Sequence, residues 1–150
     1  MADTMQFDLV SPEKRLASME VAEVRIPGTE GDLTAMAQHE ATVVTMRPGV
    51  LTVVGPQGEQ RYAVTGGFAE ISDAGVTVLA ERAHGDGDLS QEQFDTYVAE
   101  ARQSHETAQA SVQQGGEPGI VDDAVKLLAD MEALGTHMGL STNSRVAAPG

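Results

Sequence analysis

The chain of 150 residues contains no cysteine, which excludes disulfides, thiolate chemistry and zinc sites built on cysteine. It has no tryptophan, three phenylalanines and two tyrosines, so few aromatic side chains are available to line a deep ligand pocket or to stack on bases. Basic residues are also scarce, with nine against 23 acidic ones and a net charge of -14. Because nucleic acids and anionic lipids bind clustered Lys and Arg, this balance argues against both classes of partner.

Long hydrophobic runs are absent too, and none approaches the length needed to span a membrane. The first six residues carry an acidic residue and no basic one, unlike a secretory or transit segment. We therefore expect a cytoplasmic protein. A chain of this length can bury one modest core, with a second cluster only as a small satellite.

Short β-rich runs alternate with turn signals in the first half of the chain. They occupy residues 7–10, 21–26, 42–46, 50–54, 61–65, 68–71 and 76–80, a spacing typical of a sandwich or barrel. The segments Pro56-Gln57-Gly58 and Ser72-Asp73-Ala74-Gly75 supply Gly between such runs and are predicted to be hairpin loops. Loops this short require antiparallel neighbours. The pattern predicts an antiparallel β-sandwich or barrel over residues 1–84.

The second half of the chain has helical periodicity. After a polar, glycine-bearing linker at residues 85–89, Ser90 is predicted to cap a helix, with Gln93 completing a capping box. Apolar and small residues then recur every three or four positions in two stripes, 94–112 and 120–138, with Gly and Pro between them. This predicts an antiparallel two-helix hairpin over residues 90–138, which holds weakly because its first stripe is largely Ala. Residues 139–150 are expected to be a disordered tail.

Turn signals cluster most densely in residues 25–49, where three turns bearing Gly or Pro follow one another. Their spacing predicts that Glu30, Asp32 and His39 stand on exposed corners between short strands, with Gly31 inside the first corner. No bond-making chemistry is known to need this pattern. Polar side chains on rigid corners commonly bind a partner, so these residues are candidates for a binding site.

Patterns that would indicate catalysis or a cofactor are missing. The four histidines have neither i, i+4 spacing nor an acidic partner at a metal-ligand spacing. An EF-hand counted from Asp86 places Gln91 and Tyr97 where glycine and glutamate are needed. No phosphate-binding loop, nucleophile elbow or distinctive carboxylate pair stands out, and Gly66-Gly67 is interpreted as a site of close backbone packing. We therefore expect a binding or mechanical protein with no metal, no cofactor and no catalytic activity.

An ordered series of motifs carries a resemblance to a known family. The motifs are Phe7-Asp8-Leu9-Val10-Ser11-Pro12-Glu13, Ile26-Pro27-Gly28-Thr29-Glu30-Gly31-Asp32-Leu33, His39, Arg47-Pro48-Gly49, Thr65-Gly66-Gly67-Phe68-Ala69-Glu70 and Val76-Thr77-Val78-Leu79-Ala80-Glu81. Together they resemble the epsilon subunit of the F-type ATP synthase, closely over residues 5–84 and more loosely through the helical region. The resemblance implies a ten-stranded β-sandwich followed by a helical hairpin, in agreement with the patterns above.

The resemblance also implies a function, that of a central-stalk rotor subunit of a proton-translocating complex. In this family the sandwich holds the gamma subunit on one side and the polar loops of the membrane c-ring below, and it couples c-ring rotation to ATP synthesis. The family's rotor-contact positions fall here on Asp32 and His39, with Glu30 and Gly31 flanking the same loop. A carboxylate on such a corner can accept charge-assisted hydrogen bonds from c-ring donors. The alternative is that Asp32 only caps a turn.

The helical region departs from family members that bind ATP or inhibit hydrolysis. Their ATP-sensing motif, a hydrophobic residue followed by Asp-x-x-Arg-Ala, is absent, since Val98 stands where the arginine is needed. Residues 89–138 include nine acidic residues and two basic ones, Arg102 and Lys126, a balance that repels the acidic loop of the beta subunits. We expect rotor coupling with weak or no inhibition, at the cytoplasmic face of the bacterial inner membrane. The alternative is a regulatory subunit whose helices extend to the beta subunits and inhibit ATP hydrolysis.

Overall fold

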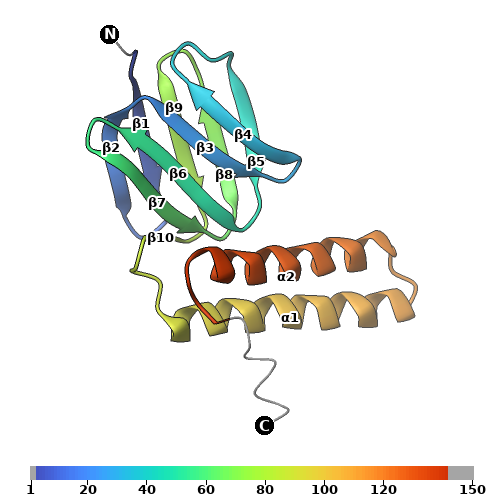
Figure 1. Ribbon diagram of the computed structural model, residues 1–150. Coiled ribbons are helices and arrows are strands. Elements are labelled where there is room, and N and C mark those ends of the chain that lie inside the picture. The colour runs from blue at the N-terminus through green and yellow to red at the C-terminus, as the bar shows by residue number, and fades with distance from the viewer. Residues whose placement is uncertain (1–2, 142–150) are drawn as a thin grey trace. The chain divides into compact units, whose positions relative to one another are not determined.

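The computed structural model describes residues 3–141, which form ten strands followed by two helices (Figure 1). The strands are β1 (Met5–Val10), β2 (Arg15–Val21), β3 (Glu23–Gly28), β4 (Gly31–Met36), β5 (Thr42–Met46), β6 (Gly49–Gly55), β7 (Gly58–Val64), β8 (Gly67–Ile71), β9 (Gly75–Ala80) and β10 (Ala83–Gly85). The helices are α1 (Gln91–Gln113) and α2 (Gly119–His137). Two compact units, here called the sandwich and the hairpin, meet in the chain between Asp88 and Leu89. The predicted β-sandwich followed by a two-helix hairpin is therefore confirmed.

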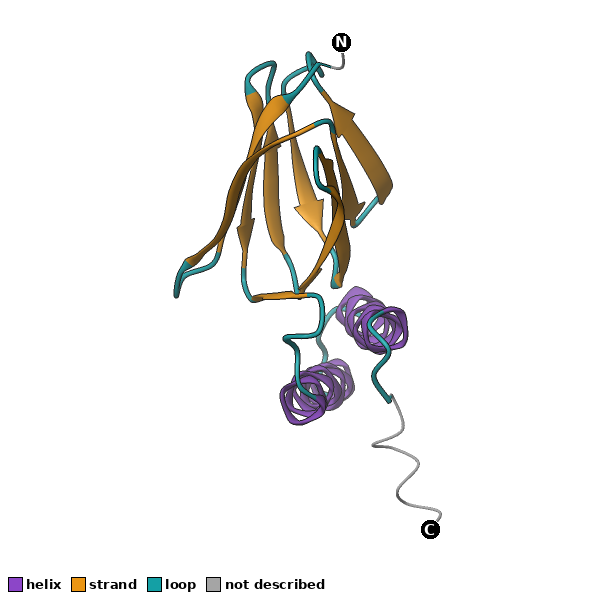
Figure 2. Cartoon of the chain, turned by 60° about the vertical axis from the view of Figure 1, so that its left-hand side comes forward, coloured by secondary structure: helices purple, strands orange, loops and turns teal. Residues whose placement is uncertain are grey.

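All ten strands belong to one sheet, in the order β10-β7-β6-β3-β5-β8-β9-β1-β2, with β4 paired to β3. The strands wrap around a common interior, which Figure 2 shows in a second view. Side chains alternate between this interior and the solvent, as the period of a strand requires. The fully buried residues include Phe7, Leu9, Ile26, Leu51 and Val78. Burial of each such side chain stabilises the sandwich by about 1.5–3 kcal/mol.

The sequence patterns miss β2, β4 and β10, and they also miss one parallel pairing. Strand β2 contains Leu16, Ala17 and Met19, which favour helices in isolation, and it is held as a strand by pairing with β1. Strand β4 fully buries only Ala35, so its alternation is weak. Strand β9 pairs in parallel with β1, a pairing that the antiparallel hairpins inferred from the short loops do not include. The two strands are distant in the chain, and no short loop joins them.

Both predicted hairpin loops of the sandwich are confirmed. Gly58, at a φ of 108°, closes the β6–β7 hairpin opposite Gly55, and residues 72–74 connect β8 to β9. Gly67 lies where β8 and β9 approach closely, and a Cβ on it would collide with the carbonyl oxygen of Leu79. The interpretation of this glycine as a point of close backbone packing is thereby confirmed.

Helix α1 begins at the predicted capping box. Ser90 Oγ accepts a hydrogen bond from the Gln93 backbone N–H at 3.0 Å, and Gln93 Oε1 accepts one from the Ser90 backbone N–H at 3.2 Å. The two helices pack against each other through Phe94, Tyr97, Val98, Ala101 and Ala108 of α1 and Ala124, Met131, Leu134 and Gly135 of α2. Phe94 is the largest fully buried side chain of α1. The buried alanines of this helix contribute less, because alanine buries little apolar area.

The predicted tail falls mostly on residues 142–150, which lie outside the described part of the chain. Residues 139–141 follow α2 with defined contacts. Gly139 takes a φ of 77°, and the Leu140 N–H donates to the Gly135 carbonyl oxygen at 2.8 Å, which closes the last turn of α2. At the predicted linker, β10 continues the sandwich through Gly85.

Candidate partner-binding site

The corner between β3 and β4 carries three of the four predicted site residues. Gly28 and Gly31 pair across the hairpin, and Thr29 and Glu30 form the turn between them. Gly31 takes a φ of 125°, which favours glycine. A Cβ on Gly28 would lie 2.6 Å from the Gly31 carbonyl oxygen, so this position also requires glycine. The turn leaves Glu30, Gly31 and Asp32 exposed.

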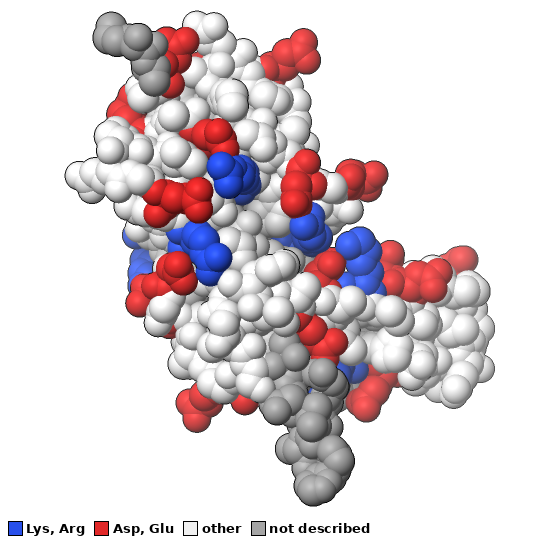
Figure 3. All heavy atoms as spheres, viewed as in Figure 1, with Lys and Arg blue, Asp and Glu red and all other residues white. Residues whose placement is uncertain are grey.

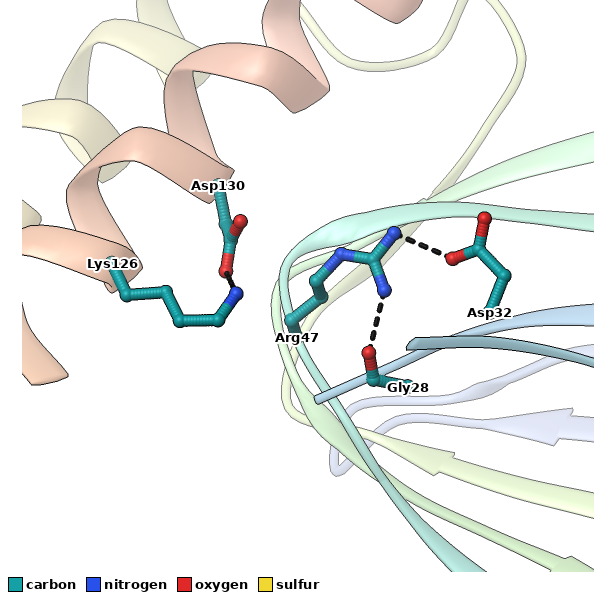
Figure 4. A network of polar contacts seen from close by, with 5 residues as sticks. All are labelled: Gly28, Asp32, Arg47, Lys126 and Asp130. Carbon is teal, nitrogen blue, oxygen red and sulfur yellow. Dashed lines mark hydrogen bonds and ion pairs between the residues drawn. The ribbon is translucent and has the colours of Figure 1, made fainter. Parts of the chain in front are cut away.

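Arg47, the residue after β5, braces this corner (Figure 4). Its Nη2 donates to Asp32 Oδ1 at 2.6 Å, and its Nη1 donates to the Gly28 carbonyl oxygen at 2.5 Å. Its backbone N–H also donates to the Pro27 carbonyl oxygen at 2.9 Å. One guanidinium thus joins the end of β5 to both strands of the β3–β4 hairpin, using the fork of donors that arginine provides.

Asp32 keeps most of its side chain in solvent despite this contact. Its side chain is 75% exposed, whereas that of Arg47 is 26% exposed. Within the described residues, the contact of Asp32 is this ion pair, made through Oδ1, rather than a turn cap. The second carboxylate oxygen of Asp32 therefore stays open to solvent, where it can accept a hydrogen bond from a cationic or N–H donor.

His39 lies away from this corner. Asp32 is near the beginning of β4, and His39 follows its end, in a turn where Gln38 takes a left-handed φ of 68°. At a rise of about 3.3 Å per residue, the four steps of β4 from Asp32 to Met36 alone span about 13 Å. His39 is half-buried, and its Nδ1 lies 2.8 Å from the Glu40 carbonyl oxygen. The structure does not bring the four predicted residues into one site.

The solvent side of β1, β5, β8 and β9 exposes large apolar side chains. Val43, Phe68 and Leu79 are 66%, 53% and 46% exposed. Phe68 pairs with Leu79 across β8 and β9, and Leu79 pairs with Val10 of β1. Phe68, Leu79 and Val10 therefore form a row across the three strands. We call Val10, Val43, Phe68 and Leu79 the apolar face. Single exposed apolar side chains are ordinary, but a contiguous group marks an interaction surface.

A shallow hollow of about 630 Å³ adjoins the apolar face. Val43 lines it together with Asp8 and Glu70, and the strand registers put both carboxylates on the same side of the sheet. Sequence reasoning missed this surface. The alternation along β8 could have revealed it, because the buried Ala69 lies between the exposed Phe68 and Glu70.

Both cations of the described hairpin are held in ion pairs within it. Arg102 of α1 pairs with Glu132 of α2 at 3.5 Å. Lys126 pairs with Asp130, one turn later in α2, at 2.9 Å (Figure 4). On the face seen in Figure 3, the Lys and Arg side chains lie beside acidic ones. The described surface of the hairpin therefore offers little positive charge to a partner.

Other features of the described residues bear on chemistry. No group of three or more His, Asp and Glu side chains within residues 3–141 could hold a metal ion. No helix in this part of the chain is long and apolar enough to cross a membrane.

Burial lowers the pKa of the His84 imidazole below its ordinary value of 6.5, and the Lys14 ammonium lowers it further. His84 is therefore neutral at pH 7.

Comparison with known proteins assigns the family. The chain is 56% identical over 144 residues to the ATP synthase epsilon chain of Paracoccus denitrificans, covering 95% of this chain and 96% of that protein. Residues 4–86 match the family model for the ATP synthase, Delta/Epsilon chain, beta-sandwich domain. The chain belongs to the ATP synthase epsilon family. The sequence-based identification of this family is confirmed.

Further relatives of the epsilon family agree. The ATP synthase epsilon chain of Jannaschia sp. is 66% identical over 80 residues, covering 53% of this chain and 61% of that protein. Among solved structures, the chain resembles one from the Euglena gracilis mitochondrial ATP synthase, OSCP/F1/c-ring in rotational state 1. That likeness has a TM-score of 0.60 and 25% identity, and it covers 87% of this chain and 80% of that one. As an epsilon chain, the protein is a stalk subunit of ATP synthase and not a catalytic one.

Proposed function

We propose that this epsilon chain is a rotor subunit of the central stalk, which couples rotation of the c-ring to the gamma subunit and so links proton flow to ATP synthesis. The observation that carries the proposal is the corner braced by Arg47, where Asp32 presents a carboxylate oxygen in a fixed position. Torque passes through contacts that keep their geometry, and a group already held in place loses little freedom on binding. The likeness to a chain of an F1/c-ring complex supports the proposal.

In this proposal the corner binds the polar loops of the c-ring. Arg or Gln side chains in such loops would find the exposed carboxylates of Glu30 and Asp32 as acceptors. Gly31 adds access for a partner backbone, because nothing lies within 4 Å of the point where its Cβ would stand.

The apolar face and its hollow bind the gamma subunit in this proposal. Apolar side chains such as Phe68 form the water-excluding centre of an interface, and the carboxylates of Asp8 and Glu70 favour basic groups of the partner around it. His39 belongs to this contact rather than to the corner, because it precedes Ala41 by two residues and Ala41 lines the hollow. Asp32 and His39 therefore contact different partners.

The hairpin inhibits ATP hydrolysis weakly or not at all in this proposal. Inhibition through the acidic loop of the beta subunits would need cations to pair with that loop, and both Arg102 and Lys126 already form ion pairs with carboxylates of the hairpin. The protein would work at the cytoplasmic face of the bacterial inner membrane, attached through the complex.

The corner is tested in the reconstituted, membrane-bound complex. Asp32→Asn removes the charge but keeps the shape, and Asp32→Lys reverses the charge. We expect ATP-driven proton pumping to fall several-fold with Asp32→Lys and less with Asp32→Asn, while the apolar face keeps the chain on gamma. Glu59→Lys is the matched control, since Glu59 is a half-exposed carboxylate on β7. Full pumping and full retention of the Asp32→Lys chain would overturn the assignment of the corner.

A further inference from the structure

We infer that a latch at the open end of the hairpin holds the two helices together. It joins Gln91 and Phe94, at the start of α1, to Gly135 and Ser141, at and after the end of α2. The latch is a property of this chain alone, whereas its consequence for regulation rests on the proposed function.

Gln91 makes the polar half of the latch. Its Nε2 donates to the Ser141 carbonyl oxygen at 2.8 Å, and its Oε1 accepts from the Ser141 backbone N–H at 2.9 Å. The side-chain amide thus pairs with one backbone residue through both of its polar atoms. Nε2 also donates to Asp95 Oδ1 at 2.9 Å, which fixes the orientation of the amide. This reciprocal pair joins residues 50 positions apart in the chain.

Phe94 and Gly135 make the apolar half. Phe94 is fully buried, and a Cβ on Gly135 would collide with its ring, so the ring is seated directly on the backbone of α2. Glycine inside a helix lowers helix stability relative to alanine, so its place in α2 calls for a compensating contact. The packing of the Phe94 ring against Gly135 is that compensating contact.

The two halves share Gly135. The chain turns back after α2 through Gly139, whose φ is 77°, and the Leu140 N–H donates to the Gly135 carbonyl oxygen at 2.8 Å. This turn is what carries Ser141 to Gln91. Displacement of Phe94 from Gly135 should therefore also loosen the Gln91 pair.

Separation of the helices would break both halves of the latch at once. The closed hairpin is therefore favoured by direct contacts, independently of the charges of Arg102 and Lys126. Within the proposed function, this gives a second reason why the helices do not extend to inhibit ATP hydrolysis.

The polar half is tested by measuring the distance between the helices in the full-length protein. Because the chain has no cysteine, spin labels can be attached at Ala99→Cys and Ala133→Cys, both exposed positions, without other changes. Double electron–electron resonance should give one population at short distance. Gln91→Ala should raise the population at longer distances about tenfold, because two hydrogen bonds are lost. Gln103→Ala is the matched control, since the Gln103 side-chain amide donates a hydrogen bond to Thr107 of its own helix, at 3.4 Å.

The apolar half is tested with Gly135→Ala, which should displace Phe94 and increase the longer distances. Gly119→Ala is the matched control, because nothing lies within 4 Å of its added Cβ. Phe94→Leu in the Gly135→Ala chain makes room for the methyl group and should restore part of the short population. Unchanged distances in both Gln91→Ala and Gly135→Ala would overturn the latch. That result would leave the rotor proposal standing, since the corner is tested separately through Asp32 and proton pumping.

Discussion

Arg47 and Asp32 form an ion pair in which the cation is largely covered and the anion is largely open. The two side chains are 26% and 75% exposed, and their closest atoms are 2.6 Å apart. The corner therefore presents a negative charge to solvent although it contains an arginine. Arg47 also donates to the Gly28 carbonyl oxygen, so it supports the turn as well as the carboxylate.

Replacement of Arg47 should weaken the corner. Arg47→Gln removes the donors to Asp32 and Gly28 and should lower the free energy of unfolding by about 1–2 kcal/mol, because hydrogen bonds to charged groups contribute at this level. Urea denaturation measures this change. Arg25→Gln is the control, since the exposed guanidinium of Arg25 pairs with Glu23 on the protein surface, and its midpoint should not move. Equal midpoints for wild type and Arg47→Gln would contradict the bracing role.

Substitutions of Phe68 and Phe7 should separate binding to the gamma subunit from stability of the sandwich. Phe68 is 53% exposed on the apolar face, so Phe68→Ser should change the free energy of unfolding by no more than about 0.5 kcal/mol. The affinity of the Phe68→Ser variant for isolated gamma subunit, measured by titration calorimetry, should fall about tenfold or more, as for a central interface residue. Phe7→Ala, in the core, should cost about 3–5 kcal/mol. Unchanged gamma affinity of Phe68→Ser would remove the apolar face from the proposed interface.

Much of the fold follows from local patterns in the sequence. Ser90 and Gln93 mark the start of α1 because a capping box acts within one turn, and Gly58 marks a hairpin because its φ is locally required. Strand β2 and the parallel pairing of β1 with β9 could not be found this way. Both depend on partners distant in the chain, and tertiary pairing overrides the local preferences of residues such as Leu16.

The candidate site shows the same division. Turn chemistry placed Glu30, Gly31 and Asp32 on one exposed corner. It could not reveal that Arg47, fifteen positions later, holds the carboxylate. Nor could it show that β4 carries His39 to the opposite end of the strand, because spacing along the chain does not give direction in space.

Gly67 should not tolerate a side chain. Its φ is 128°, and a Cβ would collide with the backbone carbonyl of Leu79, which cannot move without breaking the β8–β9 pairing. Gly67→Ala should therefore destabilise the sandwich by more than about 3 kcal/mol, measured by thermal or urea denaturation. Gly58→Ala isolates the cost of positive φ, because nothing lies within 4 Å of its Cβ, and should cost about 1 kcal/mol. Similar losses in the two variants would contradict the packing argument.

His84 should make the sandwich less stable in mild acid. Its pKa in the folded protein is lowered, first by burial and then by Lys14, so the unfolded chain takes up this proton at a higher pH than the folded one. Stability should therefore fall as the pH drops below about 6.5, the ordinary value for histidine. Urea midpoints between pH 7.5 and 5.5 should fall less steeply for His84→Gln than for wild type. A folded-state pKa above 6.5 in an NMR titration of His84 would reverse the expected sign.

Rotor coupling by the sandwich alone is tested most directly in the reconstituted complex, with the full chain and with a chain ending at Asp88, the last residue of the compact sandwich unit. ATP hydrolysis and ATP-driven proton pumping are measured side by side, at equal incorporation of the two chains. Equal hydrolysis and equal pumping are expected, because the corner and the apolar face both lie within residues 1–88. A marked rise in hydrolysis on truncation would show that the helices inhibit, and a loss of pumping would show that the sandwich does not couple the rotor without them.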